Sequence, residues 1–193
     1  MRKIFLDCGT HELEGFEELY KKCELDESWE VFCFEVVEEL IPTIQERELF
    51  KTLSNIEVIN KAVWIEDGKM PLTLDLQFDD MHDYGGATNI LGDNYLKPDY
   101  IKHELRKNAR EVETLDFSRF VRENFSKEDQ IIVKLDIEGA EYEVLDKMIN
   151  EGTVDYVNAF FVEWHNRLLD KKYDENYLRK QLAQRNIPLY YWH

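Results

Sequence analysis

The feature that most constrains the fold is a buried strand that passes through a short acidic turn into a helix. Residues 131–135 (Ile-Ile-Val-Lys-Leu) are typical of a strand covered on both faces of a parallel sheet. Apolar residues then recur at helical spacing from Ala140 to Ile149. Between them lies Asp136-Ile-Glu138-Gly139, and ligands of open α/β sheets bind at this end of a strand. The stretch predicts an α/β fold with a functional carboxylate pair, although an acid here can also simply cap the helix.

The rest of the chain alternates strands with helices, which predicts a three-layer α/β sandwich with a mostly parallel central sheet. Strands are expected at residues 3–8, 29–35, 56–64, 110–115, 131–135, 157–163 and 187–193, with an extra strand at 72–78 hairpinned to the third. Helices are expected after residue 15, over 43–53 behind Pro42, from 117, from 140 and over 174–186.

Length and composition narrow the class of protein. A chain of 193 residues suits one domain with a substantial core. The net charge of −17 argues against a nucleic-acid backbone or an anionic membrane as partner and favours a neutral or cationic ligand. No run approaches the roughly 18 apolar residues of a membrane span, and no signal peptide is evident. Cys8, Cys23 and Cys33 show neither disulfide nor zinc spacing, so we expect a reducing, cytoplasmic location.

The first strand ends in a glycine turn that predicts half of a nucleotide-binding unit. Asp7 would lie at the ligand end of the strand, and Gly9 would let a ligand approach the backbone closely. The spacing Gly-x5-Gly differs from the G-x-G-x-x-G of dinucleotide enzymes and from the phosphate P-loop. The candidate cofactor-binding residues of this turn are Asp7, Cys8, Gly9, Thr10, His11 and Gly15.

Glu35 ends the second predicted strand, where an acidic side chain can accept both ribose hydroxyls of an adenosine. Alone, such a residue is more often a plain strand-end charge, but the Asp7-x-Gly9 turn favours the ribose interpretation. Asn60, Ala62 and Val63 lie where an adenine ring could be edged or stacked. Ordinary strand packing explains each of these three equally well.

A second acidic strand end follows later in the chain. Residues 157–166 form a buried strand whose carboxyl end carries Glu163, His165 and Asn166, and this end should adjoin Asp136 and Glu138. Oxygen ligands with one imidazole suit Mg²⁺ or Mn²⁺, and the expected metal ligands are Asp136, Glu163 and His165.

His165 has other interpretations. It could act as a metal-free base or be an ordinary hydrogen-bonded histidine, and His11 is a further candidate near the cofactor. The polar, glycine-bearing residues 79–92 predict a lid or substrate loop, with a plain surface excursion as the alternative.

The sequence resembles a known family at these same segments. Val133-Lys-Leu-Asp-Ile-Glu-Gly-Ala-Glu-Tyr-Glu-Val-Leu145 is similar to the signature of the FkbM family of methyltransferases. Phe5-Leu-Asp-Cys-Gly-Thr-His-Glu-Leu-Glu-Gly15 resembles the first S-adenosylmethionine motif of that group. Residues 32–35, 60–63 and 161–165 follow in the matching order, so the resemblance covers nearly the whole chain.

The resemblance implies a Rossmann-like class I methyltransferase fold over one domain, 1–193. The cofactor half would span about 1–80, the loop 79–92 and the acceptor half about 110–193. It implies S-adenosyl-L-methionine as cofactor and O-methylation, most often of a sugar or glycan hydroxyl. By motif, Asp7, Gly9 and Glu35 would hold the cofactor, with Asp136 beside it. Catalytic roles would fall to Asp136, Glu138 and His165, with Glu163 also facing the acceptor.

Two departures from the family pattern bear on the acceptor. The chain begins at the first strand, without the N-terminal helices that often shape the acceptor pocket, and it ends soon after a sixth strand, so the usual antiparallel seventh is expected to be absent or differently supplied. We therefore expect a minimal enzyme or a domain cut from a longer protein, working as a homodimer or within a larger glycan-processing system.

Other functions stay open at this point. The acceptor could be a small molecule, a lipid or a protein. The domain could also be a non-catalytic module that binds cofactor or glycan. A nicotinamide-dependent oxidoreductase is disfavoured because G-x-G-x-x-G is missing.

Overall fold

The structure of the protein is a computed structural model that describes residues 1–73, 88, 90, 91, 95, 97, 110–170 and 173–192. Most of the predicted loop 79–92, and residues 74–78 of the predicted extra strand, lie outside the described residues.

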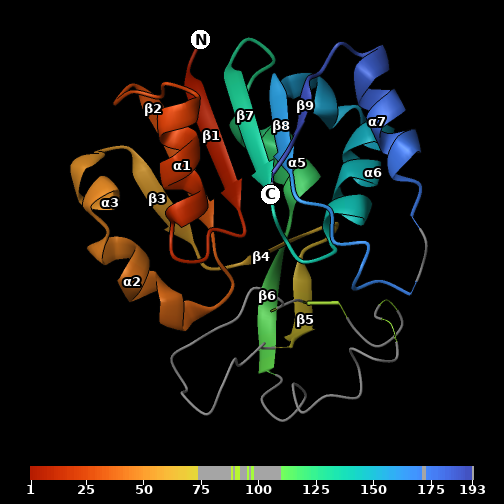
Figure 1. Cartoon of the computed structure of the whole chain (residues 1–193), viewed down its shortest axis with the longest axis horizontal. Helices are drawn as coiled ribbons and strands as arrows, with labels where there is room; N and C mark the ends of the chain where they lie inside the picture. Colours follow the sequence, from red (N-terminus) through yellow and green to blue (C-terminus); the bar gives the residue numbers. More distant parts are fainter. Residues whose placement is uncertain are drawn as a thin grey trace.

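Six parallel strands form the main sheet, in the order β3-β2-β1-β7-β8-β9 (Figure 1). In β1 and β7 every residue after the first is buried, as in strands covered on both faces. The predicted α/β sandwich with a mostly parallel sheet is therefore confirmed. The strands are β1 (Lys3–Cys8), β2 (Trp29–Phe34), β3 (Ile56–Ile59), β7 (Gln130–Leu135), β8 (Ala159–Val162) and β9 (Leu189–Tyr191).

Helices pack on both faces of this sheet. Phe16 of α1 packs on Phe5 of β1 with ring centroids 5.1 Å apart, and Phe117 of α5 packs on Phe34 of β2 at 5.7 Å. Phe5 is in register with Val31, three residues before Phe34, so side-chain alternation places α1 and α5 on opposite faces. The helices are α1 (Glu14–Lys22), η1 (Glu38–Leu40), α2 (Ile41–Glu46), α3 (Glu48–Thr52), α5 (Phe117–Asn124), α6 (Glu141–Glu151), η3 (Thr153–Tyr156) and α7 (Glu175–Gln184).

A second, three-stranded sheet lies at the carboxyl end of the main one (Figure 1). It contains β4 (Ala62–Trp64), β6 (Arg110–Asp116) and β5 (Gly68–Leu72), in the order β4-β6-β5. Asp116 ends β6 and caps α5, since its carboxylate accepts a hydrogen bond from the backbone N–H of Arg119 at 3.0 Å. The second sheet thus borders the edge at which the parallel strands end.

Two predicted strands differ in the structure. The strand predicted at 56–64 is two strands in two sheets, because the chain turns at Asn60 and Lys61. The Lys61 amide donates to the Ile59 carbonyl at 2.9 Å, and the Asn60 side chain donates to the Glu35 carbonyl at 2.8 Å. Of the strand expected at 72–78, the structure describes only Leu72 and Thr73. Leu72 is the last residue of β5 and pairs with Arg110 of β6, whereas the prediction paired this strand with the third one.

The helix predicted at 43–53 is also wrong in detail. It is divided into α2 and α3 at Arg47, whose backbone is extended (ψ 140°) and whose guanidinium contacts Glu17 of α1 at 3.0 Å. Pro42 lies inside the first turn of α2, where its missing N–H breaks no helical hydrogen bond.

The topology marks where a ligand should bind. The chain runs outward from β1 to β2 and β3 on one side, and from β7 to β8 and β9 on the other. The strand order reverses between β1 and β7, and such a point is the usual ligand crevice of α/β sheets. The described part of the main sheet has no antiparallel strand. None of the described helices has the length and apolar character needed to cross a membrane.

Candidate functional site

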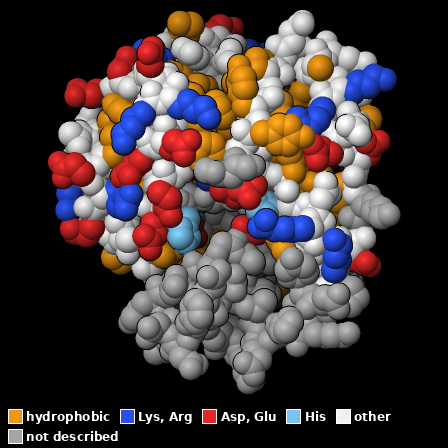
Figure 2. Space-filling view, viewed as in Figure 1, with side chains coloured by type: hydrophobic (Ala, Val, Ile, Leu, Met, Phe, Trp, Pro, Cys, Tyr) orange, Lys and Arg blue, Asp and Glu red, His pale blue; other side chains and the backbone are white. Residues whose placement is uncertain are grey.

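Polar side chains are buried together at the carboxyl edge of the main sheet. In the space-filling view, acidic side chains and histidine rings gather near the middle of this face (Figure 2). Burying polar groups is costly unless they pair with one another, so such a gathering indicates function more than stability. The buried polar residues at this edge are Asp7, Thr10, Glu35, Lys134, Glu141 and His165.

Gly9 of the first turn and Gly15 of α1 pack closely against Lys134 and Asp136. Gly9 has a left-handed backbone (φ 78°), and a Cβ there would overlap the backbone oxygen of Asp136. A Cβ at Gly15 would lie 2.9 Å from Cε of Lys134. The predicted cofactor turn is thus fitted around Lys134 and Asp136.

Lys134 is a buried cation that the sequence interpretation missed. Its Nζ donates to the Gly9 carbonyl at 2.8 Å and lies 3.2 Å from both Asp7 Oδ1 and Asp136 Oδ2. Burial alone would lower the pKa of Lys134, but Asp7 and Asp136 outweigh it and raise that pKa, so the side chain is charged. Burial raises the pKa of Asp7, which Lys134 offsets only in part. Neither Asp7 oxygen accepts a well-aligned hydrogen bond.

Glu35 lies directly after β2, and its carboxylate is fixed by backbone donors. Oε2 accepts from the His11 amide at 2.7 Å, and Oε1 accepts from the Val37 amide at 2.8 Å. Burial raises the pKa of Glu35 to about 7, although these two hydrogen bonds act in the opposite direction. The structure therefore places a carboxylate whose charged form is destabilised by burial at the position predicted to bind the ribose.

The three residues predicted to meet an adenine are not equally placed. Asn60 lines a cavity of about 410 Å³, whereas Ala62 and Val63 are buried in the core at 6% and 4% exposure. Only Asn60 therefore stands at an opening. The cavity is lined by Val36, Glu38, Asn60, Arg110, Glu111, Val112 and Glu113.

The side chains of the other residues predicted in the turn make local contacts or are buried in the core. The Thr10 hydroxyl donates to the Asp7 carbonyl at 3.0 Å, and Cys8 is fully buried in β1. Burial raises the pKa of the Cys8 thiol well above its ordinary value, so the thiol stays protonated. The His11 ring lies outward, with Nδ1 2.9 Å from Glu14 Oε1.

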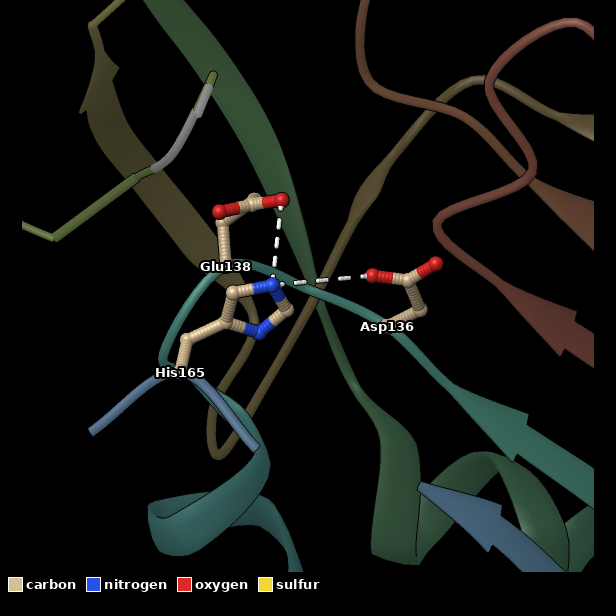
Figure 3. Close-up of side chains that lie close together, drawn as sticks. All are labelled: Asp136, Glu138 and His165. Atoms are coloured by element: carbon tan, nitrogen blue, oxygen red, sulfur yellow. Dashed lines mark ion pairs between the residues drawn. The ribbon is translucent and has the colours of Figure 1, made fainter. Parts of the chain in front are cut away.

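In Figure 3 one ring nitrogen of His165 is directed to both Glu138 and Asp136. Glu141 and Glu163 also contact the imidazole, and we call these four acidic side chains the carboxylate ring. Nδ1 of His165 lies 2.9 Å from Glu141 Oε1. Its Nε2 lies 3.3 Å from Glu138, 3.4 Å from Glu163 and 3.9 Å from Asp136. Burial alone would lower the pKa of His165, but Glu138 and Glu141 raise it to about 10. The imidazole is thus a cation at neutral pH.

Glu141 is a second residue that the sequence interpretation missed. It is fully buried and accepts the backbone N–H of Ile137 at 2.9 Å and that of Gly139 at 3.0 and 3.2 Å. These bonds hold the turn in which Glu138 has a left-handed backbone (φ 53°), a conformation that costs a non-glycine residue energy. Glu141 therefore fixes both the His165 ring and the turn that presents Glu138.

Three of these side chains have the donor set of a divalent-cation site. One ligand atom from each of Asp136, Glu138 and His165 lies within 4.8 Å of the others. Burial raises the pKa of Glu138, with Asp136 and Glu141 adding to it against His165, and Glu138 Oε2 is buried without a hydrogen-bond donor. The predicted ligand Glu163 is beside this group, whereas Asn166 points to Glu175 at 3.4 Å.

Comparison with known proteins matches most of the chain to one domain family. A family model described as the methyltransferase FkbM domain matches residues 7–185, which includes every residue of the site. No curated protein and no solved structure matches the chain.

Proposed function

Because the chain belongs to the FkbM methyltransferase family, we propose that it transfers a methyl group from S-adenosylmethionine to a hydroxyl of a sugar or glycan. The observation that carries the proposal is the position of Asp136 between two halves of one site. Its Oδ2 lies 3.2 Å from Nζ of Lys134, which itself donates to the glycine turn. Its Oδ1 lies 3.9 Å from Nε2 of His165. A group bound on the turn would thus lie beside a group bound at the carboxylate ring.

The turn side suits the nucleoside of S-adenosylmethionine. Glu35 is oriented by two amides and keeps lone pairs on both oxygens to accept ribose hydroxyls. The neighbouring cavity of about 410 Å³ is within the range of small-molecule sites, and Asn60 offers an amide that can pair with an adenine edge. Bound there, the cofactor supplies an electrophilic methyl group on a sulfonium.

The carboxylate ring suits the acceptor hydroxyl. In the transfer, the hydroxyl oxygen bonds to the methyl carbon as the sulfur–methyl bond breaks, and a base takes the hydroxyl proton. His165 is already protonated, so the charge balance favours a carboxylate, Asp136 or Glu138, as that base. A divalent cation could be held by Asp136, Glu138 and His165 only if Nε2 of His165 lost its proton, and the ion would then lower the pKa of a coordinated hydroxyl. In either case the residues act mainly by aligning the oxygen with the methyl group.

Methyl transfer itself tests the proposal. The protein would be incubated with S-adenosylmethionine labelled in the methyl group and a panel of neutral sugars, amino sugars and oligosaccharides, with and without Mn²⁺. We expect label in at least one sugar, and a loss of at least about a hundred-fold for Asp136→Asn. Glu57→Gln, an exposed change on β3, is the matched control and should transfer label normally.

The outcomes separate the acceptor classes. Label that enters only lipid or protein fractions would redirect the proposal to those acceptors. Tight cofactor binding without label in any fraction would favour a non-catalytic module.

A further inference from the structure

Lys134 joins the two halves of the site through a single ammonium group. Its three polar contacts are the Gly9 carbonyl on the glycine turn, the Asp7 carboxylate at the end of β1 and the Asp136 carboxylate at the end of β7. The Gly9 contact is a hydrogen bond, and the two carboxylates form ion pairs with the ammonium group. The side chain is only 2% exposed, so solvent screens these contacts little.

The stem of Lys134 is also held in place by packing. Gly15, in the first turn of α1, leaves room for the stem, because a Cβ at position 15 would lie 2.9 Å from Lys134 Cε and 3.4 Å from Nζ. The same Cβ would lie 3.4 Å from the Trp192 ring, so this space is closely filled. Lys134 therefore has little freedom to move its ammonium between partners.

The Gly9 contact continues towards Glu35. With its carbonyl drawn to Lys134, Gly9 directs its own amide to the Phe34 carbonyl at 3.1 Å, and the Thr10 amide follows at 3.2 Å. The next amide, that of His11, donates to Glu35 Oε2 at 2.7 Å. Three consecutive backbone amides of the turn, from Gly9 to His11, are thus hydrogen-bonded between the Lys134 contact and the proposed ribose-binding carboxylate.

We propose that Lys134 is a positioning residue, which sets the cofactor turn and Asp136 in one fixed arrangement and thereby aligns the donor with the acceptor. The inference rests on the proposed function and assigns a role to a residue outside the proposed catalytic set. Neutralisation of Asp7 does not by itself explain why Lys134 is present, because a buried ion pair adds little net stability compared with apolar groups of similar size. Nor does it explain the contacts of Lys134 with Gly9 and Asp136.

The test separates charge neutralisation from positioning by removing both members of the buried pair. Asp7→Asn is compared with the double variant Asp7→Asn/Lys134→Met, in which no unpaired charge remains in contact with position 7. If Lys134 only neutralises Asp7, adding Lys134→Met to Asp7→Asn leaves S-adenosylhomocysteine affinity equal or improved. If Lys134 positions the turn, the double variant unfolds at a temperature close to that of Asp7→Asn yet binds at least about ten-fold more weakly.

Hydrogen exchange at the His11 amide gives a readout that needs no ligand. We expect this amide to exchange at least about ten-fold faster in the double variant than in Asp7→Asn, because its bond to Glu35 depends on the Gly9 contact. Equal exchange and equal affinity would overturn the proposal. The proposal would also be overturned if neither this double variant nor Asp7→Asn/Lys134→Gln folded, because Lys134 would then be needed for folding itself. Absence of S-adenosylhomocysteine binding to the wild type would count against the proposed function, whereas the exchange result would still decide the role of Lys134.

Discussion

Glu35 should lower the free energy of unfolding near and above pH 7, where its carboxylate is charged and can accept ribose hydroxyls. Its pKa is raised by burial from 4.5 to about 7. Between these two values the folded protein binds the Glu35 proton more tightly than the unfolded chain does, so the stability contributed by this group falls as pH rises. Glu35→Gln removes the titration and keeps nearly the same shape.

The size of the effect follows from the two pKa values. Integrating the difference in bound proton from pH 5 to pH 8 gives about 1.8 pKa units, or about 2.5 kcal/mol. We therefore expect Glu35→Gln to gain about 2.5 kcal/mol of unfolding free energy relative to wild type over that interval. The glutamine loses one of the two amide contacts, which costs about 1 kcal/mol, but this offset does not depend on pH.

Urea unfolding at pH 5, 6, 7 and 8 measures this difference, and the other acidic groups of the chain cancel between the two proteins. Glu57→Gln, on the exposed side of β3, is the control and should show no comparable pH trend. A difference between Glu35→Gln and wild type that stays constant within about 0.5 kcal/mol from pH 5 to pH 8 would refute the reasoning.

Three further predictions concern the fold around the site. Gly9→Ala should lose more than about 2 kcal/mol in urea unfolding, because of its left-handed backbone and the overlap with Asp136, whereas Gly68→Ala, with its nearest neighbour at 3.9 Å, should lose under about 1 kcal/mol; equal losses would contradict this. His165 has a raised pKa of about 10, so its stabilising charge is fully present below pH 6.5 and is lost as pH rises towards 10. His165→Gln should therefore be most destabilising near pH 6 and least near pH 10, and the opposite trend would be evidence of a neutral imidazole. Glu141→Ala should lose about 3 kcal/mol of unfolding free energy. Glu141→Gln should lose much less, because an amide oxygen at the Oε1 position keeps the contacts with Ile137, Gly139 and His165. Similar losses for the two variants in thermal unfolding would count against this role of Glu141.

The main sheet could be predicted because its buried strands are recognisable from their apolar residues. Apart from Lys134, residues 131–135 are apolar without alternation, as expected of a strand covered on both faces, and β7 is such a strand. The second sheet could not be predicted in this way. Its central strand β6 joins β4 and β5 across a long stretch of sequence, and no local pattern encodes such a pairing. The turn at Asn60 was missed for a related reason, since it depends on a side-chain bond to Glu35 from another strand.

The site shows the same division. Asp7 lies near the carboxyl end of β1, and Glu35, Asp136 and His165 follow the ends of β2, β7 and β8. The carboxyl ends of parallel strands meet at one edge of the sheet, so the grouping of these residues was predictable. Lys134 was missed because a lysine inside an apolar strand has no local explanation. Two of its three partners lie on β1 and in the glycine turn, more than a hundred residues earlier in the chain, and only Asp136 is close in sequence. A charged residue in the middle of a buried strand is nevertheless a signal, since burying it requires an opposite charge nearby.

The most direct measurement is a calorimetric titration of the wild-type protein with S-adenosylhomocysteine, repeated on Glu35→Ala. If the edge formed by Asp7, Gly9 and Glu35 holds the cofactor, the wild type should bind in the micromolar range and Glu35→Ala at least about ten-fold more weakly. No binding to a folded wild-type protein, or equal binding by both proteins, would contradict the assignment of this edge as the cofactor site.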